Sequence, residues 1–329
     1  MGTMTHIAGR AAFSKAVDIV LKNADKDREK EITKLVDLME KYMGSEKIDV
    51  DYNKVKELIC DEDKTLNKYI NRLLDEINPH VLKTTALNLG YEAFFHGTKT
   101  IRKMREVHDC NVPWLILMDP TSACNLHCTG CWAAEYGNKL NLTFDEMDSV
   151  ITQGKELGIY LYMFTGGEPL VRKEDIIKLC KKHSDCAFLA YTNGTLVDEL
   201  CEQMVEVGNF YLAISLEGFE AVNDLRRGNG VYGKVMHAME LLKQYGLIFG
   251  TSICYTSKNI ETVTSDEFVD LMVEKGCRYA FYFHYMPVGN DAAVELLPTM
   301  QQRIYMKDRV RQIRNMKDGK GIFTMDFQN

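Results

Sequence analysis

Residues 114–131 read WLILMDPTSACNLHCTGC, and this stretch decides the fold. Its first half is a short run of apolar residues, which predicts a buried strand at residues 114–118. Its second half carries Cys124, Cys128 and Cys131 in the spacing C-x3-C-x2-C. A strand that runs directly into a loop of potential metal ligands indicates that the chemistry of this protein begins where that strand ends.

The cysteine loop offers three thiolates and no obvious fourth ligand. A cube of four irons held at three corners keeps one iron open, as catalytic metal sites do. The alternative is a structural zinc ion completed by His127 or His108. No second C-x2-C pair occurs nearby, and His127 directly precedes Cys128, so both would hardly reach one ion. The spacing favours an iron-sulfur cluster over zinc.

Similar apolar runs recur along the chain, each followed by a helical pattern. They cover residues 114–118, 159–164, 187–191, 210–214, 247–254 and 279–285. Thr143 and Glu146 form a predicted capping box before the first of these helices. Helices are expected to stop at Gly158, Gly208, Gly246 and Gly276. Strands that alternate with helices predict an α/β fold with parallel strands, a partial (β/α)6 barrel.

Four short motifs follow the ends of predicted strands. They are Gly166-Gly167-Glu168-Pro169, Thr192-Asn193-Gly194, Ser215-Leu216-Glu217-Gly218 and the turn from Asp224 to Gly228. In parallel barrels the carboxyl ends of the strands meet on one face, where active sites are assembled. We therefore expect these motifs and the cysteine loop to converge on one mouth. Ordinary turn chemistry would use the same residue types, so each motif alone is weak.

Taken in order, these motifs resemble those of the radical S-adenosylmethionine (SAM) superfamily. The C-x3-C-x2-C loop is similar to its signature, residues 166–169 to its GGEP element, and residues 224–228 to its D-x-x-R-G turn with Arg227 in the arginine position. The resemblance covers residues 113–289. It implies a 4Fe-4S cluster on Cys124, Cys128 and Cys131 and reductive cleavage of SAM to a 5′-deoxyadenosyl radical, which abstracts hydrogen from a substrate.

The resemblance also implies a set of SAM contacts. They are Gly166, Gly167, Glu168, Pro169, Asn193, Ser215, Glu217 and Arg227. The two glycines would present bare backbone to the SAM amino group, so a side chain at Gly167 would occupy the space of that amine. Glu168 would add a negative acceptor beside it. Asn193, Ser215 and Glu217 would bind the ribose or the methionine part, and Arg227 the carboxylate.

The sequence departs from the family pattern in two places. The residue before the last cluster cysteine is often an aromatic residue that touches the adenine, but here it is Gly130. Trp132 either takes over this contact or packs beneath the loop. The histidine that often opens the D-x-x-R-G turn is Asn223.

Composition limits the class of protein. The chain has 329 residues, 46% hydrophobic and 26% charged, enough for one α/β domain and a smaller element. Its net charge of −7 excludes nucleic acid as the main partner. Ten cysteines without a signal peptide, and no apolar stretch near ~20 residues, predict a cytoplasmic protein without a membrane span. The resemblance implies a reductant such as flavodoxin or ferredoxin.

Three regions are expected. Residues 1–110 form a helical N-terminal region, residues 111–298 the barrel, and residues 299–329 a helix and a strand with no partner. The stripe of Phe13, Val17, Val20 and Leu21 would either pack on the barrel or lie on a membrane surface. The unpartnered strand suggests a shortened chain, because relatives with this core often continue into a cysteine-rich SPASM or twitch extension.

The substrate is left open, with a peptide or a lipid favoured over another small molecule. The aromatic strand at 279–285 would line a substrate cavity or fill the core, and His284 is a candidate proton donor. Cys254 ends a strand near the mouth. The alternatives to a radical SAM enzyme are an iron-sulfur electron-transfer protein and a zinc-stabilised binding module.

Overall fold

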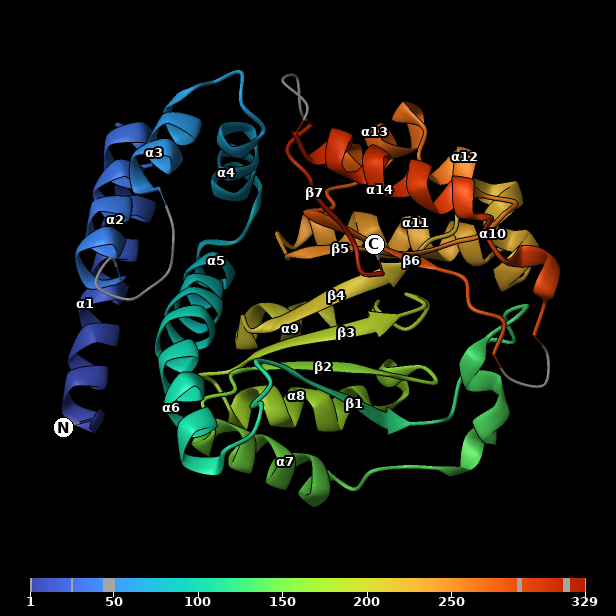
Figure 1. Cartoon of the computed structure of the whole chain (residues 1–329), viewed down its shortest axis with the longest axis horizontal. Helices are drawn as coiled ribbons and strands as arrows, with labels where there is room; N and C mark the ends of the chain where they lie inside the picture. Colours follow the sequence, from blue (N-terminus) through green and yellow to red (C-terminus); the bar gives the residue numbers. More distant parts are fainter. Residues whose placement is uncertain (1, 25, 44–50, 289–291, 316–319, 329) are drawn as a thin grey trace.

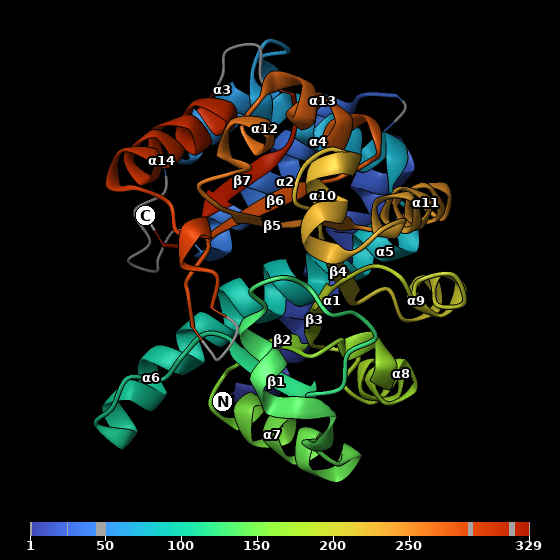
Figure 2. The ribbon, with the colours of Figure 1, turned by 90° about the vertical axis from the view of Figure 1, so that its right-hand side faces the viewer.

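In a computed structural model, the protein is described for residues 2–24, 26–43, 51–288, 292–315 and 320–328. Within these ranges seven parallel strands form one sheet in chain order (Figure 1). They are β1 (Ile116–Thr121), β2 (Leu161–Gly166), β3 (Ala187–Thr192), β4 (Phe210–Ser215), β5 (Phe249–Tyr255), β6 (Tyr279–His284) and β7 (Phe323–Asp326). The sheet curves without closing, and β1 and β7 are its two edges (Figure 2). The predicted partial barrel with parallel strands is confirmed.

Helices cover the outer face of the sheet. They are α7 (Phe144–Glu156), α8 (Lys173–Lys182), α9 (Cys201–Val207), α10 (Glu220–Arg227), α11 (Val231–Gln244), α12 (Ile260–Val263), α13 (Asp266–Glu274) and α14 (Met300–Asn315), with short 3-10 turns η2 (Trp132–Lys139), η3 (Pro169–Arg172) and η4 (Val294–Leu296). The predicted capping box of Thr143 and Glu146 begins α7. Gly158 and Gly208, two of the predicted stops, have φ of 93° and 68°, a conformation that favours glycine.

Successive side chains of a strand point to opposite faces of the sheet. One set therefore points outward and packs against the helices. Tyr162 of β2 points outward and donates its hydroxyl to the Ile151 carbonyl of α7 at 3.0 Å. Tyr282 of β6 does the same toward α12, donating to the Val263 carbonyl at 3.1 Å. These contacts fix which residues face the helices and which face the inside of the barrel.

The N-terminal region is helical, as predicted. It comprises α1 (Gly2–Asn23), α2 (Arg28–Met43), α3 (Tyr52–Cys60), α4 (Thr65–Glu76), α5 (Pro79–Thr85), the π-helix η1 (Ala86–Gly97) and α6 (Thr98–His108). Val20, Ile32, Val36 and Ile59 form a small core of their own. Ile77, Val81 and Ile101 instead belong to the barrel core, so the later helices share one core with the sheet across the predicted boundary at 110.

The apolar stripe on α1 packs inside the protein. Val17 and Val20 are buried, and the Phe13 ring lies 5.8 Å from the ring of Tyr91 in η1. Of the two alternatives for this stripe, the structure therefore supports packing. The helices in the described part of the chain include none with the length and apolar character of a membrane span.

The C-terminal strand, for which the sequence showed no partner element after it, pairs with an earlier strand. Phe323 of β7 pairs with Tyr279 of β6 in parallel register. Helix α14 makes the crossover between them and buries Met306, Val310 and Ile313 in the barrel core. The partner was not evident in the sequence because β6 lies some forty residues earlier and is joined to β7 only through α14. Residues 289–291 and 316–319, which flank this segment, lie outside the described residues.

Candidate active site

The loop that carries the three cysteines directly follows β1, at the carboxyl end of that strand (Figure 1). All three are partly buried free thiols. The backbone N–H of Leu126 points at the Cys124 sulfur at 3.5 Å, and Arg227 Nη1 lies 3.9 Å from the Cys128 sulfur. Donors aimed at sulfur stabilise thiolate over thiol, which is the form that ligates metals.

Burial raises the pKa of the Cys124 and Cys128 thiols. The charges of Arg227 and Arg226 oppose this shift at Cys128. Without a metal, such partly desolvated thiols would stay protonated at neutral pH. A cationic group bound between them would reverse that, because a coordinated thiol loses its proton outright.

The loop fits a cluster better than a single zinc ion. In the part of the chain that the structure describes, one group of three or more potential ligands has all its donor atoms within 4.8 Å, and it contains none of these cysteines. His127 is exposed, and His108 is exposed at the end of α6. Neither histidine joins the thiols, so the zinc alternative lacks its fourth ligand, whereas a 4Fe-4S cluster needs only the three separated thiolates.

The glycine turn after β2 is locked to the cysteine loop. The Gly167 N–H donates to the Thr121 carbonyl at 2.9 Å, and the Glu168 N–H donates to the Ala123 carbonyl at 2.8 Å. A Cβ at Gly167 would overlap the Ala123 carbonyl oxygen, and one at Gly166 would lie 2.6 Å from the Thr121 oxygen. The absence of side chains therefore lets the turn approach the cysteine loop, a different reason from the expected space for a SAM amine.

Glu168 is turned into the protein. It is almost fully buried, and its carboxylate accepts from the Thr192 hydroxyl at 2.6 Å, the Asn193 N–H at 2.7 Å and the Leu170 N–H at 3.0 Å. Burial raises the pKa of Glu168, and these three donors oppose the rise. Pro169 follows as the first residue of η3. Glu168 thus ties the end of β2 to the end of β3, and its acceptor capacity is directed to these partners.

Asn193 continues this network toward the cysteines. Its Nδ2 donates to Asn125 Oδ1 at 2.8 Å, and Asn125 lies between Cys124 and Cys128. Its Oδ1 accepts from the Thr195 N–H at 2.9 Å. Ser215, at the end of β4, is only partly buried, and its hydroxyl makes no hydrogen bond with the described residues. Of the two, the Ser215 hydroxyl is the one left available to a ligand.

Glu217 is held by two consecutive arginines. Its Oε1 accepts from Arg226 Nη1 at 2.5 Å and from Arg227 Nε at 3.0 Å, while its Oε2 is buried and has no partner among the described residues. Burial alone would lower the pKa of Arg226, but Glu217 and the nearby thiols raise it overall. Arg227 therefore contacts both Glu217 and Cys128. The Glu217–Arg227 pair thus connects the end of β4 to the cysteine loop.

Asn223 stands at the position where the family pattern often has a histidine. Its Oδ1 accepts from the Glu217 N–H and its Nδ2 donates to Asp224 Oδ1, each at 3.1 Å. Asp224 in turn accepts from the Gly230 and Tyr232 N–H groups. The side-chain amide of Asn223 thus makes the two hydrogen bonds that hold Glu217 beside the turn.

Tyr285 occupies the space beside Gly130. A Cβ at Gly130, whose φ is 66°, would lie 2.5 Å from the Tyr285 hydroxyl oxygen. Tyr285 is 2% exposed, and the Arg226 guanidinium lies 5.9 Å from its ring centre. Trp132 is 45% exposed, so it does not pack beneath the loop as one alternative expected. Tyr285, which follows β6, thus leaves no room for a side chain at Gly130.

The inside of the barrel is aromatic. The Phe283 ring of β6 meets Tyr191 of β3 at 5.8 Å and stacks on Phe327 at 4.7 Å. The Tyr191 hydroxyl lies 3.9 Å from the Met163 sulfur. Cys254 pairs with Phe283 across β5 and β6, so its thiol shares this inner face, and burial raises its pKa to about 11.

His284 lies on the opposite face of β6, which corrects its expected role as a proton donor in the cavity. It is two residues from Tyr282, whose side chain points outward to α12. Its neighbours in space are the Tyr255 ring and Arg303, and burial lowers its pKa. Aromatic residues on both faces of this strand concealed the orientation in the sequence.

Sequence reasoning missed three residues of this mouth. Arg226 occupies an unspecified position of the D-x-x-R-G turn, and Tyr285 ends a strand that was treated as possible core. Asp119 of β1 lies beside Gly166 and is exposed, and its carboxylate has no hydrogen bond or ion pair with the described residues. Partial desolvation raises its pKa. A carboxylate inside an otherwise apolar strand run was the signal available in the sequence.

A curved parallel sheet with three thiols and a set of strand-end turns at one mouth defines a class of partial-barrel proteins. Residues 118–279 match the model of the radical SAM superfamily. This part of the chain is therefore a radical SAM domain, and the superfamily consists of enzymes whose cofactors are a 4Fe-4S cluster and SAM.

Similar proteins agree with this assignment. The AdoMet-dependent heme synthase of Methanosarcina barkeri is 29% identical over 202 residues, covering 59% of this chain and 57% of the relative. The cysteine-type anaerobic sulfatase-maturating enzyme of Clostridium perfringens is 28% identical over 165 residues and 44% of each chain. Streptococcus suis SuiB bound to SAM superposes with a TM-score of 0.57 at 15% identity, covering 70% of this chain and 54% of SuiB. The chain thus spans about half the length of these relatives.

Proposed function

We propose that this protein is a radical SAM enzyme that holds its cluster on Cys124, Cys128 and Cys131 and uses it to cleave SAM. The observation that carries the proposal is the contact between the glycine turn and the cysteine loop, where Gly167 and Glu168 bond to the carbonyls of Thr121 and Ala123. This contact places a backbone turn directly beside the thiols, at the mouth of an aromatic barrel.

The bound cofactors would supply a 5′-deoxyadenosyl radical, which removes a hydrogen atom from an unactivated carbon. The residues of the chain would hold and orient these cofactors. Ser215 offers a free hydroxyl at the mouth, and Glu217 offers a buried oxygen without a partner, both suited to the ribose or amine of SAM. Arg227 would take the SAM carboxylate while it keeps Glu217 in place. Asn193 and Glu168 keep the turns in register.

For the substrate we propose a peptide with an apolar side chain at the reacting position. Two observations support this choice. SuiB has been crystallised with its precursor peptide SuiA, and the C. perfringens enzyme matures sulfatases. The inner face of the barrel presents Met163, Tyr191 and Phe283, which suits an apolar group and excludes water from the reacting carbon.

The reducing electron would come from a flavodoxin or ferredoxin, and the protein would work in the cytoplasm. All ten cysteines are free thiols, in agreement with a reducing compartment.

The test is anaerobic reconstitution followed by a SAM cleavage assay on the dithionite-reduced protein. We expect about four irons per chain and formation of 5′-deoxyadenosine and methionine. Replacing Cys124, Cys128 and Cys131 together with Ala should abolish both. Cys60→Ala is the matched control, because this thiol is exposed on α3 and should leave iron content and cleavage unchanged.

Each other outcome selects a different function. Reduced cluster without any 5′-deoxyadenosine would identify an electron-transfer protein. Stoichiometric zinc that is lost from the triple variant would identify a zinc-stabilised module. Apolar peptides should increase 5′-deoxyadenosine formation and appear as products altered in mass, whereas stimulation by lipid vesicles alone would replace the peptide with a lipid substrate.

A further inference from the structure

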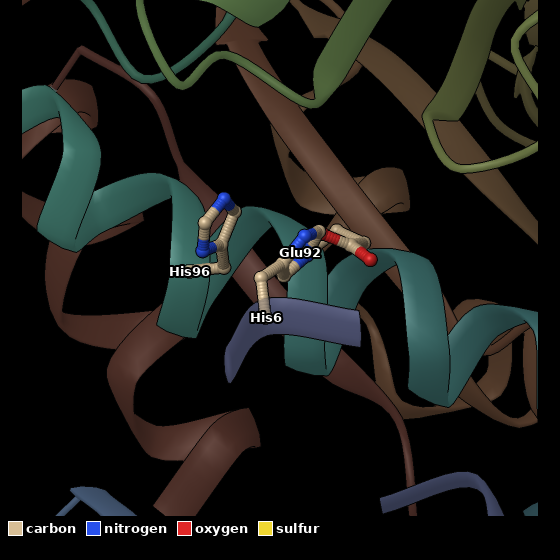
Figure 3. Close-up of side chains that lie close together, drawn as sticks. All are labelled: His6, Glu92 and His96. Carbon is tan, nitrogen blue, oxygen red and sulfur yellow. The ribbon is translucent and has the colours of Figure 1, made fainter. Parts of the chain in front are cut away.

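Two histidines and a glutamate meet at the amino ends of the strands, the end of the barrel opposite to the cysteine loop. His6 comes from α1, and Glu92 and His96 come from the π-helix η1 (Figure 3). Their potential ligand atoms all lie within 4.8 Å of one another. His96 also contacts Tyr160, which precedes β2, with ring centres 5.9 Å apart. This group therefore joins an N-terminal helix to the base of the barrel.

The conformation of η1 and its contact with α1 set the positions of these three side chains. A π-helix closes its hydrogen bonds over five residues, so Glu92 and His96, four residues apart, project from the same face. The Tyr91 hydroxyl donates to the His6 carbonyl at 3.0 Å and fixes α1 against η1. Gly9 permits this approach, because a Cβ there would overlap the Tyr91 hydroxyl. Extended π-helical segments are rare and often mark functional sites.

The carboxylate is buried and only partly satisfied. Glu92 is 1% exposed, and its Oε2 lies 2.8 Å from His6 Nε2. Arg10 Nε approaches Oε1 at 2.7 Å, yet neither atom has a hydrogen bond of good geometry in the described structure. Arg10 is held in turn by Asn88 Oδ1 at 3.3 Å, and Asn88 Nδ2 donates to the Cys186 carbonyl just before β3.

This arrangement has the chemistry of a metal site. Two imidazoles and one carboxylate are the ligand set of open sites for zinc and for other first-row divalent transition metals. The proton between His6 and Glu92 stands where an ion would bridge them, so binding would displace that proton. Arg10 would then orient the carboxylate from behind, as outer-shell groups do in such sites.

An ion pair of Glu92 with His6 and Arg10, without a metal, would explain the positions of Glu92 and His6. It would not explain the position of His96. The His96 ring stacks on His6 with centres 3.8 Å apart and an angle of 17°. The His96 ring makes no hydrogen bond or ion pair with the described residues, and its ligand atom lies within 4.8 Å of those of His6 and Glu92. An ion held between the three side chains would use this ring nitrogen.

We propose that His6, Glu92 and His96 bind a divalent first-row transition-metal ion, of which Zn²⁺ is the representative, and that this ion fastens α1 to the base of the barrel. The site is separate from the cysteine loop and independent of the proposed radical chemistry. It closes a loop from residue 6 to residue 92, so its effect is on the attachment of the N-terminal helices.

The test uses the full chain with Cys124, Cys128 and Cys131 replaced by Ala, so that the loop thiols do not compete for the ion. Circular dichroism confirms that this variant is folded. Equilibrium dialysis should give about one Zn²⁺ per chain. Zn²⁺ at a hundredfold excess over Kd should raise Tm by about 5 °C, and Mg²⁺ should not. Co²⁺ should give visible absorption bands without the sulfur charge-transfer bands of a thiolate site.

Adding His6→Ala should weaken Zn²⁺ binding at least tenfold and remove the Tm shift. His96→Ala should do the same, and His6→Ala keeps the test decisive if loss of the buried His96 ring prevents folding. His237→Ala, which removes an exposed imidazole on α11, is the matched control and should bind as the parent does. Binding of less than a tenth of an equivalent by the parent, or equal binding by the His6→Ala and His237→Ala proteins, would overturn the proposal.

Discussion

The two ends of the barrel each contain a buried glutamate beside arginine, but they are assembled in different ways. At the mouth, Glu217 meets Arg226 and Arg227, its neighbours in the turn that follows β4. At the base, Glu92 meets Arg10 and His6 from a helix more than eighty residues away in sequence. At the mouth, the segments after β2, β3 and β4 are each bonded to the cysteine loop after β1, whereas the base is a single contact between two helices.

This difference predicts how each end fails. At the mouth, the loops after β1, β2, β3 and β4 share hydrogen bonds, so damage to one should reach the cysteines. At the base, damage should loosen α1 and leave the cysteine loop intact. Variants that unfold the mouth without loss of iron, or that lose iron after a change at the base, would erase the distinction.

Glu217→Ala should have the largest effect. It leaves two buried guanidinium groups without their carboxylate, and removing one partner of a buried ion pair costs about 3–5 kcal/mol. We expect a corresponding fall in the free energy of unfolding by urea, together with reduced iron content. Glu206→Ala is the control, because this exposed carboxylate pairs with Lys181 at the surface, where such pairs contribute about 0–1 kcal/mol. Equal losses in both variants would contradict the assignment.

Gly167→Ala should come next. The new methyl group would overlap the Ala123 carbonyl, so the cysteine loop must move, and overpacking of this kind costs about 1–3 kcal/mol. Iron content after reconstitution should fall along with SAM binding, measured by calorimetry. Gly233→Ala adds the same methyl group on α11, where nothing lies within 4 Å, and should keep the full cluster. A Gly167→Ala protein with a full cluster and weak SAM binding would instead restore the expectation drawn from the sequence.

At the base, Gly9→Ala tests the approach of α1 to η1 on a smaller scale. In the native protein the methyl group would overlap the Tyr91 hydroxyl and should lower stability. In a Tyr91→Phe background the overlap with the hydroxyl is gone and a contact of 3.3 Å with the ring carbon Cζ remains. The same change should therefore be less destabilising there, because the helix preference of Ala over Gly, about 1 kcal/mol, offsets the remaining contact. Thermal unfolding of the four proteins gives the coupling energy. Additive effects would mean that α1 and η1 are not in the described contact, and iron content should not change in any of them.

The smallest effect is expected at Asp119. Partial desolvation holds its pKa above the ordinary value of 3.8, so the ionised form is disfavoured in the folded state. The stability associated with its protonated form is therefore present below pH 3.8 and is lost as pH rises through the folded pKa. Asp119→Asn removes this penalty, so its Tm relative to the native protein should be higher at pH 7 than below pH 3.8. A difference independent of pH would show that Asp119 is not desolvated.

The sequence was sufficient where order along the chain determines position in space. The six strand predictions and the glycine helix ends agree with the structure because alternating strands and helices allow few arrangements. The start of β1 is an exception: Trp114 extends the apolar run, but it is 48% exposed and stacks on Phe94 of η1, and the strand begins at Ile116.

Contacts between distant segments were beyond the reach of the sequence. The π-helical turn of η1 has no distinct residue pattern, so the meeting of His6 with His96 could not be anticipated. The hydrogen bonds of Glu168 could not be anticipated because its donors, Thr192 and Asn193, belong to the next strand end. The face of His284 could not be assigned because aromatic residues line both sides of β6, and packing alone decides between them.

The clamp on Glu217 has a consequence for electron transfer. Two guanidinium groups share one carboxylate, which leaves one uncompensated positive charge within reach of the Cys128 sulfur. A cluster held by Cys128 would gain negative charge on reduction, and positive charge beside it would stabilise that form and raise the reduction potential until the SAM carboxylate is bound. The two arginines that hold the mouth together would then also widen the range of electron donors able to reduce the protein.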